Sequence, residues 1–289
     1  MERRTGDRAF KRVMVGGIKT ASVSRQQMGR LMVGDCLAAR RGGRRPKLVF
    51  AANGHAVAMA ATSAKFAKTF QSADIVHADG APVVFASRMT EAPIPERSAT
   101  TDFLHDAAAM AQAHGLKFFL LGATEEINAA CAKMLGECYP RLQIAGRRHG
   151  YFSRGDEIPI CEEINRSGAD VLWVGLSVPL EYEFCERNRD NLTAGWIVTC
   201  GGCFNFAAGA YKRAPEWMQR AGLEWAYRLW REPGRLFWRY AVTNPLAAFL
   251  LLTRTDISPR LRGEQPPKAA RGEYAAKSPS APLRGAPPP

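Results

Sequence analysis

Long apolar runs are missing from this sequence. No stretch of about 18 consecutive apolar residues occurs, so the sequence predicts no membrane-spanning helix. The first 15 residues are polar and rich in arginine, and they lack the apolar segment of a secretory signal peptide. We therefore expect a protein that is made in the cytosol and stays there.

Paired cysteines and nucleotide-binding glycine motifs are missing as well. The seven cysteines are scattered, without the spacing of a zinc site or a disulfide framework, which predicts reduced thiols. We expect no metal site and no cofactor. Cys200 and Cys203 form one C-x-x-C pair, for which tight packing at a strand end is favoured over redox or metal chemistry. The absence of G-x-G-x-x-G after the first predicted strand, and of a Walker motif, argues against dinucleotide oxidoreductases and P-loop NTPases.

Positive charge is what the sequence has in excess. The formal net charge is +13, and the extra cations concentrate near the N-terminus and between residues 212 and 262. Nucleic acid, anionic lipid and a phosphorylated substrate are three partners that such charge can serve. The excess positive charge therefore belongs to the two end regions, which we expect to have functions separate from that of the middle of the chain, where positive and negative charges are close to balanced.

Between residues 47 and 203, short apolar runs alternate with segments of helical period. This alternation predicts an α/β fold in which helices flank a mostly parallel, Rossmann-like sheet. The predicted strands cover residues 48–52, 75–78, 117–121, 142–145, 171–175 and 196–200. The predicted helices cover residues 56–70, 101–113, 125–138, 157–166 and 181–191.

The ends of the predicted strands are rich in glycine. In parallel sheets, ligands bind beyond the carboxyl ends of the strands, and glycine there lets backbone N–H groups approach an anion such as a diphosphate. The same glycines also suit ordinary strand-to-helix turns. The candidate binding residues at these ends are Asn53, Gly80, Gly122, Gly175, Pro179 and Gly202.

Aromatic and arginine residues alternate through residues 217–240, before an apolar run at 245–252 that is too short to span a bilayer. Tryptophan, tyrosine and arginine at helical spacing are typical of a helix that lies at a membrane surface. Stacking on single-stranded nucleic acid and packing of the rings on the core are the alternatives. We favour membrane docking over both.

Four segments follow from these patterns. We expect a basic disordered N-terminus at 1–14, an α/β catalytic domain at 15–209 and a helical basic and aromatic appendage at 210–255. Proline, glycine, alanine and serine dominate residues 256–289 and cannot form a core, which predicts a disordered tail.

Asp79 is the best candidate for a general base. It directly follows the predicted strand 75–78 and precedes Gly80, so its carboxylate belongs at the ligand-binding edge of the sheet. Asp-Gly is also a common turn, which is the competing interpretation. A cation for a departing diphosphate is available from Arg97 or from the arginines of the C-terminal segment.

A series of motifs runs through the chain in a fixed order. They are A-N at 52–53, A-D-I-V-H-A-D-G at 73–80, E-R at 96–97, F-L-L-G at 119–122, G-Y-F at 150–152, G-G-C-F at 201–204, R-A-P-E-W at 213–217 and G-L-E-W-A-Y-R-L at 222–229. Over residues 15–254 the chain thereby resembles the WecG/TagA/CpsF family, glycosyltransferase family 26. Each motif alone is weak, but their order and the last two blocks are specific.

The resemblance implies an inverting, metal-independent transfer from a UDP-sugar to a polyprenyl-diphosphate-linked saccharide at the inner face of the cell membrane. It implies that Asp79 is the catalytic base and Arg97 an active-site arginine. It also implies that the C-terminal appendage binds the membrane and helps close the site, with Arg213, Arg228 and Arg235 near the phosphates.

Two loops depart from the family pattern. The usual P-K-Q-E-x-W reads P-L-E-Y-E-F at 179–184, which places Glu181 in the loop, and the usual aspartate after G-G-x-F is Asn205. Both residues are expected to bind substrate, so the departure predicts a hexose other than N-acetylmannosamine or its uronate, as in exopolysaccharide synthesis. A catalytically inactive partner subunit that binds UDP-sugar or lipid is the alternative. A nucleic-acid partner is not expected, and a homo-oligomer is left open.

Overall fold

The structure is a computed structural model that describes residues 10–42, 44–259 and 261. Residues up to Asp256 form one compact unit, and the residues from Ile257 onward form a second, of which only 257–259 and 261 are described. The expected disordered tail therefore lies outside the described residues from 262 onward, as do residues 1–9 of the expected N-terminal segment.

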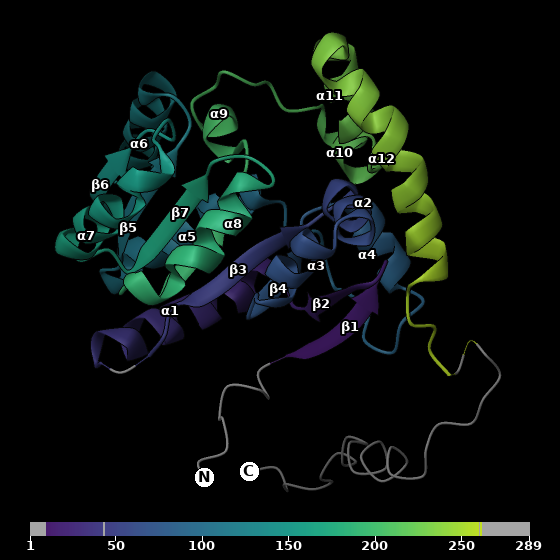
Figure 1. Ribbon diagram of the computed structural model, residues 1–289, viewed down its shortest axis with the longest axis horizontal. Coiled ribbons are helices and arrows are strands. Elements are labelled where there is room, and N and C mark those ends of the chain that lie inside the picture. Colours follow the sequence, from purple (N-terminus) through teal and green to yellow (C-terminus); the bar gives the residue numbers. More distant parts are fainter. Residues whose placement is uncertain (1–9, 43, 260, 262–289) are drawn as a thin grey trace, which may run out of the picture. The chain divides into compact units, whose positions relative to one another are not determined.

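The centre of the first unit is a parallel sheet, and in the described part of the chain it has six strands in the order β4-β3-β8-β7-β5-β6 (Figure 1). Its strands are β3 (Lys47–Ala52), β4 (Ile75–Ala78), β5 (Lys117–Gly122), β6 (Gln143–Arg148), β7 (Val171–Gly175) and β8 (Trp196–Thr199). The sheet confirms the predicted fold class. The largest difference is β6, which runs on to Arg148 because its pairing with β5 continues through a register shift after Phe118.

Both faces of the sheet are buried, as expected for parallel strands between two helical layers. Leu172 and Val174 of β7 point into one core cluster, whereas Val171 and Trp173 point into the other. The helices of the first cluster are α2 (Gly54–Thr62), α3 (Ala64–Gln71), α4 (Ala81–Ser87), α7 (Glu157–Ser167), α8 (Leu180–Asn188) and the end of α12 (Pro233–Thr253). Those of the second are α1 (Arg25–Arg40), α5 (Thr100–His114), α6 (Glu125–Cys138) and α9 (Cys203–Ala207).

Two predicted helices need correction. The expected helix 56–70 is two helices, because Ser63 has extended backbone angles that end α2 and its side chain accepts a hydrogen bond from the Phe66 N–H (3.2 Å) to begin α3. The expected helix 181–191 begins one residue earlier as α8 and ends at Asn188, where a 3-10 turn (Arg189–Asn191) takes over.

An antiparallel hairpin precedes the sheet, formed by β1 (Lys11–Val15) and β2 (Ile18–Ser22). Gly16 and Gly17 form its turn with φ values of +60° and +82°, which glycine adopts without strain. The expected disorder of residues 1–14 is therefore wrong for residues 11–14. A Gly-Gly pair between two short apolar runs is a hairpin signal that would have predicted these strands.

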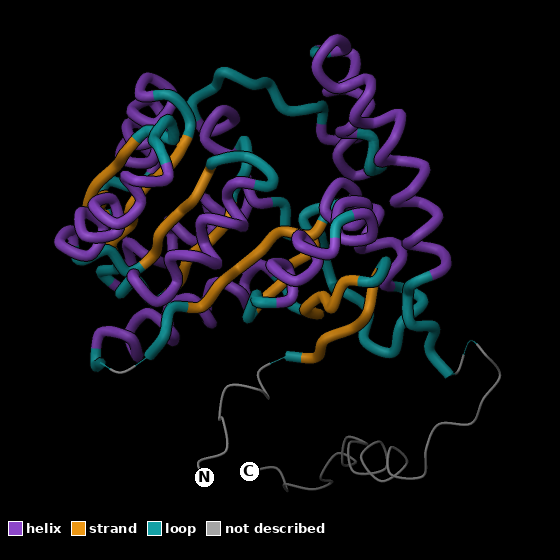
Figure 2. The backbone as a smooth tube through the Cα atoms, in the orientation of Figure 1, coloured by secondary structure: helices purple, strands orange, loops and turns teal. Residues whose placement is uncertain are grey.

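The C-terminal appendage, residues 210–255, contains α10 (Glu216–Arg220), α11 (Glu224–Arg231) and α12 (Pro233–Thr253). An irregular connection leads into it from α9, and α12 packs on α2 and α4 (Figure 2). None of the described helices combines the length and apolar character needed to cross a bilayer.

The C-terminal end of α12 is tied to the N-terminal hairpin. The Gly17 N–H donates to the Arg254 carbonyl (2.8 Å), and the Gly16 N–H donates to Thr255 Oγ1 (3.0 Å). The Asp256 N–H donates to the Met14 carbonyl (3.1 Å). These three hydrogen bonds fix the end of the appendage.

Candidate active site

A cavity of about 600 Å³ lies beyond the carboxyl ends of the strands. One wall, called the sheet wall below, consists of residues that follow β3, β4, β7 and β8, and the other, the appendage wall, consists of residues of α11 and α12. Cavities of roughly this volume hold small organic ligands. The position is the one predicted from the strand ends.

Asp79 stands on the sheet wall as the first residue after β4. Its Oδ1 accepts a hydrogen bond from the Thr100 N–H (2.9 Å), at the start of α5, and its Oδ2 accepts one from Asn53 Nδ2 (3.2 Å). Asn53 follows the neighbouring strand β3, and its Oδ1 caps α2 by accepting from the Ala56 N–H (3.1 Å). The pairing of β3 with β4 thus brings the two predicted residues together.

The protonation state of Asp79 follows from its surroundings. Burial alone would raise its pKa, but the positive charge of Arg97 and the N–H of Thr100 together hold the pKa below its usual range. Asp79 is therefore an ionised carboxylate at neutral pH. It can accept a proton, although a lowered pKa makes it a modest base.

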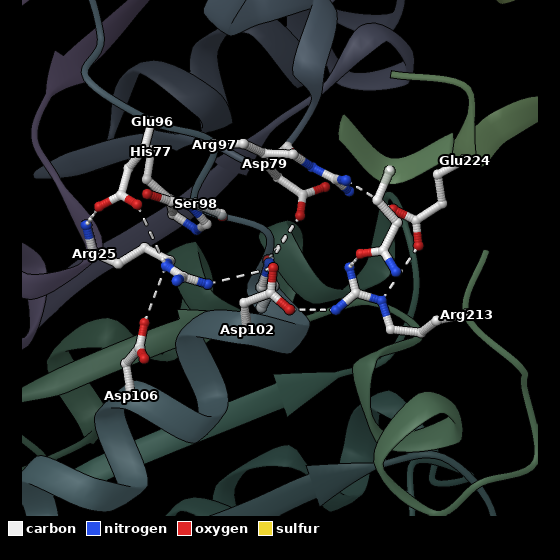
Figure 3. Close-up of polar contacts among 12 residues, drawn as sticks. Arg25, His77, Asp79, Glu96, Arg97, Ser98, Asp102, Asp106, Arg213 and Glu224 are labelled. Atoms are coloured by element: carbon white, nitrogen blue, oxygen red, sulfur yellow. Dashed lines mark hydrogen bonds and ion pairs between the residues drawn. The ribbon is translucent and has the colours of Figure 1, made fainter. Parts of the chain in front are cut away.

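Arg97 joins the Asp79 turn to the appendage. Its Nε donates to the Asp79 carbonyl oxygen (2.7 Å), and its guanidinium pairs with Glu224 of α11 (2.8 Å). Glu224 also pairs with Arg213 (3.5 Å), which in turn pairs with Asp102 of α5 (Figure 3). A chain of alternating charges therefore links the sheet wall to the appendage.

Arg228 and Arg239 are the cations of the appendage wall without a carboxylate partner in the described part of the chain. The Nε atom of each is buried and has no hydrogen-bond partner. Each guanidinium lies against a ring: Arg228 is 5.4 Å from that of Phe206, and Arg239 is 5.3 Å from that of Tyr240. This wall offers unneutralised positive charge to an anionic ligand.

The cavity residues that were not predicted as site residues include three with ionisable side chains, Arg239, Glu224 and His55. Arg239 stands four residues after Arg235, a spacing that places both on one side of a helix and would have identified it. His55 is half-buried, and burial together with the charge of Arg239 lowers its pKa, so it is neutral. No local pattern distinguishes His55 or Glu224.

Glu181 forms part of the cavity floor, in the first turn of α8. Its Oε2 accepts a hydrogen bond from the Gly201 N–H (2.8 Å). Burial raises the pKa of this carboxyl group to about 8, and the negative charge of Asp79 contributes to the increase. Glu181 is thus mainly protonated at neutral pH, unlike Asp79.

Most of the predicted site residues meet at this cavity. Those that line it are Asn53, Asp79, Gly80, Arg97, Glu181, Gly202, Asn205, Arg228 and Arg235. Arg235 also pairs with Glu232 (2.5 Å). Arg213 does not line the cavity and reaches it only through Glu224, so its role at the phosphates stays a prediction.

Gly122, Gly175 and Pro179 do not line the cavity either. Gly122 has φ +140°, and a Cβ atom there would stand 2.3 Å from the Gly175 carbonyl oxygen. Close packing of two strand ends therefore requires glycine at this position. The expected binding roles of these three residues stay predictions.

Thiols border the cavity at Cys200 and Cys203, which are both free and buried. Burial raises the pKa of each well above its ordinary value, so they are protonated thiols, in agreement with the packing interpretation. Within the residues that the structure describes, no three His, Cys, Asp or Glu side chains gather as a set of metal ligands.

Comparison with known proteins gives a consistent result. The model of the glycosyl transferase WecG/TagA/CpsF family matches residues 13–260. The chain is similar to the N-acetylglucosaminyldiphosphoundecaprenol N-acetyl-beta-D-mannosaminyltransferase of Bacillus subtilis (strain 168), with 30% identity over 181 residues, 63% of this chain and 69% of that protein. It is also 30% identical over 191 residues to the protein of the same name from Staphylococcus aureus (strain MRSA252), covering 65% of this chain and 74% of that protein.

Proposed function

The chain belongs to the WecG/TagA/CpsF family of glycosyltransferases, and from that premise we propose that it transfers a hexose-type sugar from a UDP-sugar to a polyprenyl-diphosphate-linked saccharide. The acceptor class follows the names of the two relatives, which specify a sugar on diphosphoundecaprenol. The product would enter an exopolysaccharide or another polysaccharide of the cell envelope.

The observation that carries this proposal is the pairing of two unlike walls around one cavity. An ionised carboxylate, Asp79, faces the same space as Arg228 and Arg239, which have no carboxylate partner in the described residues. A sugar transfer from a nucleotide diphosphate needs a base on one side of the sugar and cations on the other.

In the proposed reaction, an acceptor hydroxyl oxygen forms a bond to C1 of the donor sugar as the bond from C1 to the UDP oxygen breaks. The hydroxyl proton passes to the Asp79 carboxylate, and the electron pair of the broken bond leaves with UDP. Arg228 and Arg239 stabilise the negative charge that develops on the diphosphate, as guanidinium groups do for phosphate oxygens. Attack opposite the leaving group inverts the configuration at C1.

The donor is proposed to differ from that of the relatives. Their names specify an N-acetylmannosaminyl group. In this chain Glu181 and Asn205, one from each of the two loops that depart from the family pattern, both line the cavity where the sugar would lie. We expect another hexose.

The appendage is proposed to dock on the inner face of the cell membrane, where a polyprenyl acceptor is anchored. Large apolar side chains on α11 and α12 are exposed: Trp230 is 73% exposed, Trp238 75%, Val242 66% and Leu252 70%. Exposed tryptophans beside arginines suit the headgroup region of a bilayer. This arrangement would bring the cavity to its acceptor.

The proposal is tested by incubating the protein with a panel of UDP-hexoses and UDP-N-acetylhexosamines and a short-chain polyprenyl-diphosphate N-acetylglucosamine. We expect one donor to give UDP release and an extended lipid-linked saccharide detected by mass spectrometry, and expect neither from the Asp79→Asn variant. Binding of a UDP-sugar without any UDP release would instead support an inactive partner subunit. Failure of every donor to bind would reject the proposed function.

A further inference from the structure

Glu181 differs from every other carboxyl group near the cavity. Its side chain is only 2% exposed, yet it contributes to the cavity floor. Of the two other acids that line the cavity in the described part of the chain, Glu224 pairs with Arg97, and the positive charge of Arg97 also lowers the pKa of Asp79. In the described part of the chain, Glu181 has no ion pair. A buried carboxyl group without a cation keeps its proton more readily than a paired one.

The groups around Glu181 donate hydrogen bonds to it and do not supply positive charge. The N–H groups of Gly201, Ser177 and Leu176 point to its carboxyl group, with the first at 2.8 Å from Oε2. They favour the ionised form, but the effect of burial on the pKa is larger. A protonated Glu181 therefore has an O–H group that can donate a hydrogen bond to an oxygen atom of a ligand.

The titratable groups that face Glu181 come from three elements. Asp79 stands at the end of β4, Tyr182 and Cys185 follow on α8, and Cys200 stands at the end of β8. Burial raises the pKa values of the phenol and of both thiols well above their ordinary values, so these three stay neutral. Asp79 is the facing group that carries charge at neutral pH, and its charge is negative.

We propose that Glu181 is a specificity-determining residue of the donor site, where its carboxyl group gives a hydrogen bond to an oxygen of the donor hexose. This inference rests on the proposed function. The donor sugar has to lie between the base Asp79 and the diphosphate. Glu181 lines the cavity that holds Asp79, Arg228 and Arg239, and its Oε2 accepts a hydrogen bond from the Gly201 N–H. A hydroxyl or acyl oxygen of an uncharged hexose is the acceptor that fits.

The test separates the contribution of the sugar from that of UDP. Dissociation constants for UDP and for the tightest-binding of UDP-glucose, UDP-galactose and UDP-N-acetylglucosamine are measured by calorimetry between pH 6.5 and 9.5. The ratio of the UDP dissociation constant to the UDP-sugar dissociation constant rises as the sugar is bound more tightly. Because UDP carries more negative charge than a UDP-sugar, the sugar contacts of Glu181 are read from the difference in this ratio between wild type and variant at the same pH, and the measurement does not require transfer. We expect this ratio to fall as the pH rises through about 8, because the proton of Glu181 is lost.

Three variants decide the outcome. Glu181→Gln keeps a hydrogen-bond donor, so its ratio should stay near the wild-type value at pH 7 and not change with pH. Glu181→Ala should lower the ratio about three- to tenfold at pH 7, the worth of one hydrogen bond. Glu183→Gln is the matched control, because Glu183 is on the same helix but pairs with Lys65 (2.7 Å) away from the cavity.

Three results would overturn the proposal. The first is a Glu181→Ala ratio equal to that of the wild type, and the second is a Glu181→Gln ratio with the same pH dependence as the wild type. The third is a donor UDP-sugar that binds no more tightly than UDP. Loss of transfer with intact, Glu181-dependent sugar binding would count against the proposed reaction and leave the role of Glu181 supported.

Discussion

The two walls of the cavity are built on opposite principles. On the sheet wall, both carboxylate oxygens of Asp79 accept hydrogen bonds, and Arg97 is held by the Asp79 carbonyl and by Glu224. On the appendage wall, Arg228 and Arg239 have no carboxylate partner in the described residues, and their Nε atoms have no acceptor. The charged groups of the sheet wall are partnered within the protein, whereas two guanidinium groups of the appendage wall can take an anionic ligand.

This difference suits the two walls to different functions, one to the reaction and the other to ligand binding. Groups that are already oriented by the protein stabilise a reaction without reorganising, which suits the position of the base. Buried donors without acceptors are unfavourable, and a ligand that supplies the acceptor removes that cost on binding. The sheet wall is therefore suited to chemistry, and the appendage wall to binding.

The substitution with the largest expected effect, Asp79→Asn, tests the sheet wall. Asparagine keeps the size of the side chain and one acceptor oxygen but cannot take a proton at neutral pH. We expect the turnover number to fall about 10²- to 10⁴-fold, the usual contribution of a general base. Transfer is measured by UDP release, and the binding of UDP and the melting temperature serve as controls. Full activity in this variant would show that Asp79 is not the general base.

The appendage wall is tested by Arg228→Gln and Arg239→Gln. Each should weaken UDP-sugar binding about ten- to a hundredfold, because a charge-assisted hydrogen bond is worth about 1.5 to 3 kcal/mol. Calorimetry measures the dissociation constants. Arg220→Gln is the control, since Arg220 is 78% exposed and pairs only with Glu216 in the described residues. Equal weakening in the control would show that overall charge, not the position of the arginines, determines binding.

The exposed face of the appendage gives a smaller expected effect. Replacing both Trp230 and Trp238 by serine should reduce binding to vesicles that contain anionic lipid about tenfold, because two interfacial rings are lost. Sedimentation with vesicles measures the change, and transfer to a short-chain, detergent-free acceptor should be retained. Unchanged sedimentation would show that Trp230 and Trp238 do not contribute to membrane binding.

The dependence of stability on pH gives the smallest effect. The folded-state pKa of Asp79 is lowered, so its ionisation stabilises the fold above the unfolded pKa near 4 and this contribution disappears as the pH falls through the lower folded value. The difference in urea unfolding free energy between wild type and Asp79→Asn should therefore shrink on acidification, by at most about 1.4 kcal/mol per pH unit. A difference that grows toward low pH would contradict the assigned shift.

The sheet wall was largely predictable from residue patterns, whereas on the appendage wall Arg228 and Arg235 were predicted from the family resemblance, and Arg239 and Glu224 were not predicted. Strand periodicity placed Asn53 and Asp79 at the ends of two strands, and the parallel pairing of β3 with β4 brought them together. The pairing of Arg97 with Glu224 joins residues that are far apart in the chain, and no local pattern predicts it. The break at Ser63 was missed for a different reason, because one side-chain cap overrides a continuous helical period.

The hydrogen bonds between the N-terminal hairpin and residues 254–256 hold one end of α12 in place. A tilt of the helix about that end would therefore displace its other end the most. Arg235 lies about 28 Å from the fixed end at 1.5 Å per residue, so a tilt of about 5° would carry it about 2 Å while residues near Arg254 hardly move. Pro245 stands between the fixed end and the cavity arginines and gives the helix no N–H, which makes bending easiest there. A displacement of α12 near Trp238 would therefore move the cavity arginines further than it moves the residues that are hydrogen-bonded to the hairpin.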